Sequence, residues 1–131
     1  MKKELLNKIA SVLKEHPEIA FAYLYGSFLK QPEVANDIDI AVGLKGISDL
    51  YRALEITGSV KDKLYDLIPK PVDLRILNFA TVSFCLDVLE EGFLFYEADE
   101  EYLTDFIESI SAKAVQTITN RYDLEGEFCR L

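Results

Sequence analysis

The 131-residue sequence has no tryptophan and little sulfur, with one methionine and two cysteines. Cys85 and Cys129 are too few and too far apart for a disulfide framework or a zinc site, so we interpret both as buried free thiols. Long apolar runs are also missing. Stretches such as Ile19 to Tyr25 fall far short of the ~20 residues of a membrane span, and the first residues lack the apolar region of a signal peptide. We therefore expect a cytoplasmic protein without a membrane partner.

Basic residues are the second scarcity, because 14 Lys and Arg stand against 23 Asp and Glu and give a formal net charge of −9 at pH 7. This charge repels phosphate backbones and argues against DNA or RNA as a partner. Lysines such as Lys30, Lys61 and Lys70 can still hold the few charges of a small anion. Half of the residues are hydrophobic, and no repeat or composition break interrupts the chain. We expect a single domain over residues 1–131.

Hydrophobic patterning predicts the strands. Residues 18–25 are apolar on both faces, as in a strand in the middle of a sheet. In residues 37–44, Ile38 and Ile40 face one way, whereas Asp37 and Asp39 face the other. Residues 71–78 and 93–97 predict two further strands.

Helical periodicity fills the segments between these strands. A first helix stops before Pro17, and two further helices are predicted to follow caps at Asn78 and Asp99. Residues 48–69 predict a long helix with inward residues Leu50, Leu54, Val60, Leu64 and Ile68. The expected core stripe of the last helix is Tyr102, Leu103, Phe106, Ile107, Ile110, Ala114 and Ile118. This order predicts an α/β (α+β) fold, a small mixed β-sheet with flanking helices.

The two aspartates inside the apolar strand 37–44 are the first candidate site residues. Residues two apart on a strand project from one face about 6.6 Å apart, so the carboxylates of Asp37 and Asp39 can converge on one cation. Mg²⁺ takes oxygen ligands, typically one or two carboxylates together with substrate phosphates and water. Asp73, on a neighbouring predicted strand, could add a third ligand.

Gly26 and Ser27, at the end of the strand 18–25, are the candidate phosphate-binding residues. Free backbone N–H groups at the start of a helical turn favour an anion, Gly26 permits close approach, and the Ser27 hydroxyl can donate another hydrogen bond. A nucleoside triphosphate bridged by Mg²⁺ fits between the two motifs. The expected reaction is in-line displacement at phosphorus, with Asp73 orienting or deprotonating the acceptor hydroxyl. The alternative interpretation is a plain turn beside a solvated strand edge.

Other polar residues near these motifs receive structural interpretations. Arg75 is interpreted as an ion-pair partner of the aspartates, not as a substrate ligand. The tyrosines are interpreted as packing residues, not as stacking platforms; they are Tyr23, Tyr25, Tyr51 and Tyr65.

The motifs "LYGSF", "DIDIAV" and "PVDLRIL" together resemble the minimal nucleotidyltransferases (MNT) of the DNA polymerase β superfamily. The element order lets the resemblance extend across nearly the whole chain. It implies a polymerase β-like nucleotidyltransferase core and Mg²⁺-dependent nucleotidyl transfer, usually from ATP. In that scheme Asp37, Asp39 and Asp73 bind the metal, and Gly26 and Ser27 hold the triphosphate.

The loop between the motifs departs from the family pattern. It has nine residues where members commonly have ten, keeps a base as Lys30, and has Gln31 where members carry a glycine. The resemblance also implies a partner, because minimal nucleotidyltransferases pair with small helical HEPN proteins and add AMP to the toxin. We expect the antitoxin half of such a pair, which adenylylates a partner hydroxyl. We favour a tyrosine, because a hydroxyl with a pKa near 10 is easier to ionise than an aliphatic alcohol. The alternative is a weak or inactive module that neutralises the partner by contact. A homo-oligomer is compatible with both.

Overall fold

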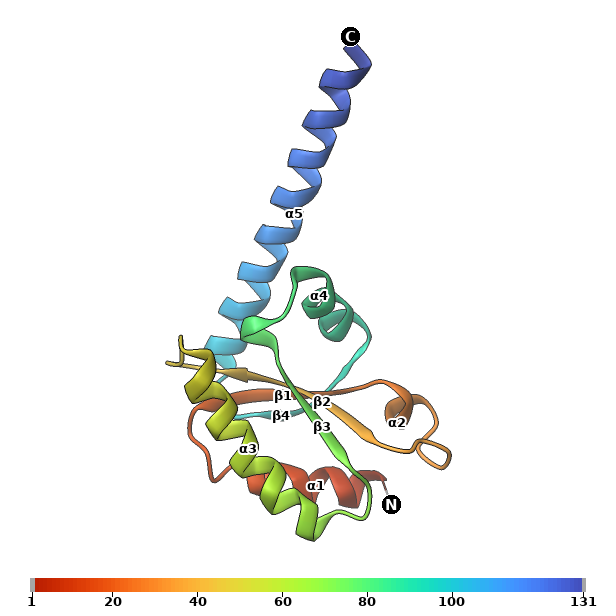
Figure 1. The fold of residues 1–131 in the computed structure, drawn as a ribbon, viewed down its shortest axis with the longest axis vertical. Coiled ribbons are helices and arrows are strands. Elements are labelled where there is room, and N and C mark those ends of the chain that lie inside the picture. Colours follow the sequence, from red (N-terminus) through yellow and green to blue (C-terminus); the bar gives the residue numbers. More distant parts are fainter. Residues whose placement is uncertain (1, 131) are drawn as a thin grey trace.

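The structure, a computed structural model, describes the backbone of residues 2–130 and the side chains of residues 2–118. Its centre is a four-stranded sheet in the order β3-β2-β1-β4 (Figure 1). The strands are β1 (Ile19–Tyr25), β2 (Ile38–Leu44), β3 (Val72–Ile76) and β4 (Phe93–Glu97). Because β1 is antiparallel to β2 and β4, whereas β2 is parallel to β3, the predicted mixed sheet is confirmed.

Helices cover both faces of the sheet (Figure 1). They are α1 (Lys2–Leu13), α2 (Ser27–Lys30), α3 (Leu50–Leu67), α4 (Val82–Glu91) and α5 (Glu100–Arg130), with the 3₁₀ turn η1 (Leu77–Phe79) before α4. α1 and α3 pack on one face, and α4 with the first part of α5 packs on the other, which confirms the α/β architecture. Within residues 2–130, no helix combines the length and the apolar character that crossing a membrane requires.

The strands send alternate side chains into two separate hydrophobic cores. Ile38 and Ile40 of β2 lie in the core with α1 and α3, whereas Ala41 lies in the core with α4 and α5. β1 is buried on both faces, with Leu24 in the first core and Phe21 in the second. The predicted two-sided strand is confirmed, and the alternation of β2 leaves Asp39 on the α4 face.

The predicted inward residues of α3 are only partly correct. Val60, Leu64 and Ile68 are buried, but Leu50 and Leu54 are 48% and 54% exposed. Each residue along a helix rotates the side chain by about 100°, so neighbouring positions face the core in the first turns of α3 instead. The two leucines were assigned to the wrong side of the helix.

One of the two predicted helix caps is confirmed. Asp99 caps α5 and accepts a hydrogen bond from the Tyr102 backbone N–H at 2.9 Å. Asn78 does not cap α4, because Thr81 holds that position and accepts from the Phe84 backbone N–H at 3.1 Å. The Asn78 side chain instead bonds the backbone N–H and carbonyl of Leu44, each at 2.8 Å. The Asn78 side chain therefore stabilises the end of β2 and not the start of α4.

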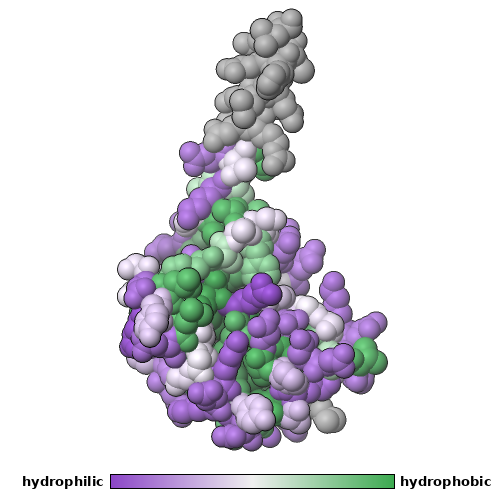
Figure 2. All heavy atoms as spheres, in the orientation of Figure 1, coloured by the Kyte–Doolittle hydropathy of each residue, from purple (hydrophilic) through white to green (hydrophobic). Residues whose placement is uncertain are grey.

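The last helix extends far beyond the sheet on which it starts. Its 31 residues span about 46 Å, whereas strands of five to seven residues span about 17–24 Å. Leu103 and Ile110 are buried as predicted, but Ile107 and Ile118 are 36% and 68% exposed, so their assignment to the core was wrong. Figure 2 shows hydrophobic side chains where α5 leaves the body.

Cys85 is a buried free thiol, as predicted. Its thiol donates a hydrogen bond to the Leu77 carbonyl oxygen at 3.3 Å, and burial raises its pKa, which keeps it protonated and unreactive. Cys129 lies outside the described side chains.

Candidate active site

The predicted acidic residues meet at one end of the sheet. Strand pairing aligns Tyr25 of β1 with Asp39 of β2, and Asp39 with Asp73 of β3. These three residues form a row across three strands on the α4 face, because residues directly paired across a sheet point the same way. Asp37 stands one position before β2, close enough for its charge to raise the pKa of Asp39.

Gly26 is in direct contact with this row. Its φ of 78° and ψ of −159° turn the chain sharply between β1 and α2. A Cβ atom added at Gly26 would lie 2.4 Å from Oδ2 of Asp39, so the Asp39 carboxylate occupies the space that a side chain would need. The Gly-Ser turn and the acidic residues, which were predicted to act together, therefore lie side by side.

Ser27 is the first residue of α2 and is exposed to solvent. The predicted helical turn after Gly26 is present, and the backbone N–H of Gln31 donates to the Ser27 carbonyl oxygen at 2.7 Å. Phe28, only 2% exposed, anchors the turn in the first core. The free N–H groups of this turn and the Ser27 hydroxyl are available to an anion.

The charges on this face act strongly on one another. The pKa of Asp39 is raised first by burial and then by the negative charges of Asp37 and Asp73, with Arg75 opposing the shift. Burial, followed by the charge of Asp39, raises the pKa of Tyr25 to about 12. Burial is the first cause of both shifts, and the neighbouring negative charges, which a bound cation would offset, add to it.

Arg75 is the positive charge that opposes the pKa shifts of Asp39 and Tyr25. Its Nε lies 3.5 Å from Oδ2 of Asp73, so the predicted ion pair is confirmed. Its guanidinium also stands 5.7 Å from the centroid of the Phe84 ring, and Phe84 meets the Tyr25 ring edge-on at 5.5 Å. Phe84 was not predicted from the sequence, because the side of α4 that faces the row of Tyr25, Asp39 and Asp73 depends on how the helix packs.

The acidic residues of this site carry donor atoms suited to a metal ion. Carboxylate oxygens are the donors that Mg²⁺ prefers, and the raised pKa of Asp39 shows that its charge is poorly compensated. In the part of the chain with described side chains, no three His, Cys, Asp or Glu side chains stand close enough to hold one ion. Asp73 is also engaged in the ion pair with Arg75. The donor types fit Mg²⁺, and its binding by Asp73 would compete with the Arg75 ion pair.

A hollow of about 250 Å³ adjoins Gly26 between α2 and α4. Tyr25 and Gly26 form one side, Lys30 of α2 contributes a cation, and Phe84 and Asp87 of α4 stand opposite. Lys30 is thus placed three residues after Ser27, beside the same hollow. The hollow thus adjoins the Gly26 turn, with Lys30 on the α2 side and the carboxylates of Asp87 and Glu91 on the α4 side.

The tyrosines behave in two ways. Tyr23 is 6% exposed and Tyr25 is half-buried, as predicted for packing residues. Tyr51 and Tyr65 of α3 are 75% and 86% exposed, so the packing interpretation was wrong for both. Neither tyrosine belongs to the stripe of α3 that faces the sheet.

The chain is similar to known proteins in sequence and in structure. A family model described as "Polymerase beta, Nucleotidyltransferase" matches residues 7–101. Comparison with functionally curated proteins found no match.

Several solved structures share the fold over nearly the whole chain. One is the tri-AMPylated Shewanella oneidensis HEPN toxin in complex with MNT antitoxin, at a TM-score of 0.67 and 24% identity over 95% of this chain and 97% of that chain. A toxin–antitoxin complex with AMP-PNP also matches at a TM-score of 0.67 and 24% identity, over 92% of this chain and 95% of that chain. The toxin–antitoxin complex MntA–HepT matches at a TM-score of 0.64 and 22% identity, over 94% and 96% of the two chains.

Proposed function

The chain belongs to the polymerase β nucleotidyltransferase family, and we propose that it transfers AMP from ATP to a hydroxyl, that of a tyrosine, on a small helical HEPN-type partner. The contact between Gly26 and the Asp39 carboxylate carries this proposal, because it joins a phosphate-binding turn to a row of acids. The similar structures support the partner and the nucleotide, since one holds an AMPylated HEPN toxin and another holds AMP-PNP.

The donor triphosphate binds at the turn after β1. Backbone N–H groups of the first turn of α2 and the Ser27 hydroxyl donate to phosphate oxygens, while Lys30 adds a positive charge beside the same hollow. Mg²⁺ held by Asp37, Asp39 and Asp73 would neutralise phosphate charge and polarise the phosphorus. Gly26 leaves room for this arrangement because it lacks a side chain.

The acceptor hydroxyl approaches Asp73, at the far end of the row from the Gly26 turn. Its oxygen bonds to the α-phosphorus, the bond from that phosphorus to the bridging oxygen breaks, and pyrophosphate leaves. Asp73 orients the hydroxyl and accepts its proton. A tyrosine suits this step, because a phenol with a pKa near 10 ionises more readily than an aliphatic alcohol.

The biological setting follows from the chemistry of the product. AMP attached to a partner adds bulk and negative charge, which can block a partner's own active site. We assign the chain to the antitoxin half of a HEPN/MNT pair that acts in the cytoplasm, where ATP is supplied. Its net charge of −9 favours a protein acceptor over nucleic acid.

Intact-mass spectrometry tests the proposal. The chain is co-expressed with a small helical HEPN-type protein, and the mass of that partner is measured with and without ATP and Mg²⁺. We expect a mass increase equal to one or more AMP groups, lost in Asp37→Asn. Glu33→Gln is the matched control, because Glu33 is an exposed carboxylate in the same loop. A partner that binds tightly but never gains mass would leave contact inhibition as the function.

A further inference from the structure

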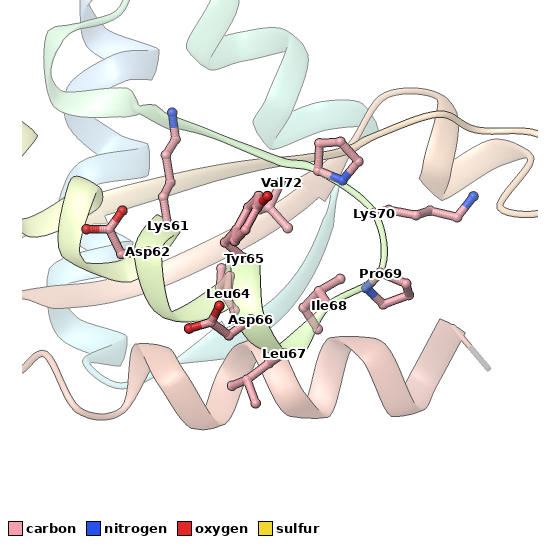
Figure 3. A pocket seen from close by; sticks show the side chains of 11 residues that line it. Lys61, Asp62, Leu64, Tyr65, Asp66, Leu67, Ile68, Pro69, Lys70 and Val72 are labelled. Atoms are coloured by element: carbon pink, nitrogen blue, oxygen red, sulfur yellow. The ribbon is translucent and has the colours of Figure 1, made fainter.

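A second, larger hollow lies outside the candidate site. It has a volume of about 790 Å³ and runs between the second half of α3 and the start of β3; we call it the α3–β3 groove (Figure 3). Its lining includes Lys61 and Tyr65 of α3 and Lys70, Pro71 and Val72 at the start of β3. Figure 3 shows the Tyr65 side chain directed from α3 toward Val72, so an aromatic ring and an aliphatic side chain form its apolar part.

The groove lies beside an open edge of the sheet. β3 is the first strand in the order β3-β2-β1-β4, and in the described part of the chain only β2 pairs with it. Its outer backbone N–H and C=O groups are therefore free to pair with another strand. The same strand carries Asp73, the carboxylate assigned to the acceptor hydroxyl.

The two faces of β3 connect the groove with the acid row. Val72 packs against the core with α1 and α3 and lines the groove, whereas Asp73, the next residue, joins the row on the α4 face. A strand added to the edge of β3 would alternate in the same way. One side chain would enter the groove beside Tyr65, and its neighbour in sequence would lie beside Asp73.

We propose that the α3–β3 groove and the free edge of β3 bind the acceptor segment of the partner protein. The segment is extended, pairs with β3, presents its acceptor hydroxyl to Asp73, and packs an adjacent apolar side chain on Tyr65 and Val72. This inference rests on the proposed function and deepens it by naming where the protein substrate binds.

Charge and exposure at the groove support a protein segment as the occupant. Tyr65 is 86% exposed, and an exposed aromatic ring is the side chain most enriched at the centre of protein interfaces. Lys61 and Lys70 line the groove and can each pair with an acidic side chain of the segment, and the Lys70 ammonium also donates to the Ala35 carbonyl oxygen. Asp62 and Asp66 also line the groove, so only the places beside the two lysines favour an acidic side chain of the segment.

The test compares two tyrosines of the same helix. Tyr65→Ala removes the groove aromatic, whereas Tyr51→Ala makes the same change at a residue of α3 that is 75% exposed and outside the groove. With the co-expressed partner as substrate, we expect Tyr65→Ala to raise the KM for the partner about tenfold, with ATP affinity by calorimetry unchanged. Tyr51→Ala should leave both values at those of wild type.

Three results would count against the inference. An unchanged KM in Tyr65→Ala, or an equal rise in Tyr51→Ala, would show that the groove does not hold the acceptor. A wild-type dimer in sedimentation that Tyr65→Ala dissociates would assign the groove to a second copy of the chain. In each of these cases the wild-type protein still transfers AMP to the partner. If the proposed function itself were wrong, the wild-type protein would transfer no AMP, so the two failures are distinguishable.

Discussion

Replacing Gly26 by alanine tests the contact between the proposed phosphate-binding turn and the acid row. The φ of 78° and ψ of −159° at Gly26 lie in a region that costs a residue with a Cβ atom about 1–3 kcal/mol. The new Cβ would also lie 2.4 Å from Oδ2 of Asp39, so the carboxylate must leave its rotamer at a further cost of about 0.5–1.5 kcal/mol. We expect Gly26→Ala to lower the free energy of unfolding by about 1.5–4.5 kcal/mol.

Two other glycines separate these effects. Gly46 also has a positive φ, 73°, but a Cβ there meets nothing within 4 Å, so Gly46→Ala should cost only the backbone term of about 1–2 kcal/mol. Gly58 lies within α3 with open space around it, so Gly58→Ala should stabilise the protein by about 0.5–1 kcal/mol.

Urea unfolding at pH 7 and calorimetry with Mg-ATP are the assays. From the highest to the lowest free energy of unfolding, we expect the order Gly58→Ala, wild type, Gly46→Ala and Gly26→Ala. Only Gly26→Ala should also lose Mg-ATP affinity, because it displaces the Asp39 carboxylate. The reasoning is refuted if Gly26→Ala is as stable as Gly46→Ala and binds Mg-ATP as wild type does.

Three further predictions follow from the site. Without metal at pH 7, Asp39→Asn should raise the Tm, because burial and the charges of Asp37 and Asp73 raise the pKa of Asp39 and its ionised form destabilises the fold. This gain should disappear below pH 3.8, where the native carboxyl is protonated; thermal scans giving equal gains at both pH values would contradict it. Ser27→Ala should slow AMP transfer about ten- to a hundredfold, since a hydroxyl bond to phosphate contributes about 1.5–3 kcal/mol, and a wild-type rate in a mass-spectrometric time course would count against it. Arg75→Met should strengthen Mg²⁺ binding without ATP by up to about fivefold, because an exposed ion pair with Asp73 contributes at most about 1 kcal/mol; calorimetry showing weaker binding would oppose this.

Residues whose role depends on local pattern were predicted correctly. The alternation in β2 placed Asp39 opposite Ile38 and Ile40, and the strand order then aligned Asp39 with Asp73. The cap at Asp99 was also predictable, because a side chain that bonds the first turn of its own helix needs no distant partner. The β2 alternation and the Asp99 cap arise from contacts within a few residues in the chain, whereas the alignment of Asp39 with Asp73 depends on the pairing of two strands.

Residues whose role depends on distant segments were not predicted correctly. Asn78 has the chemistry of a helix cap, yet its amide bonds the backbone of Leu44 and accepts no bond from α4. Leu54 fits a helical stripe but faces solvent, because the sheet covers a different side of α3. Phe84 was missed because its place over Arg75 exists only once α4 has packed on the sheet.

The sequence by itself predicted the kind of chemistry, since a Gly-Ser pair and three aspartates at this spacing favour a site for phosphate and a cation. Only the tertiary structure decided how these residues are held. It brought Gly26 against Asp39, engaged Asp73 with Arg75, and left the edge of β3 open beside Tyr65. The physical reason is that side-chain direction along one strand follows from backbone geometry, whereas contact between strands and helices depends on the packing of the whole chain.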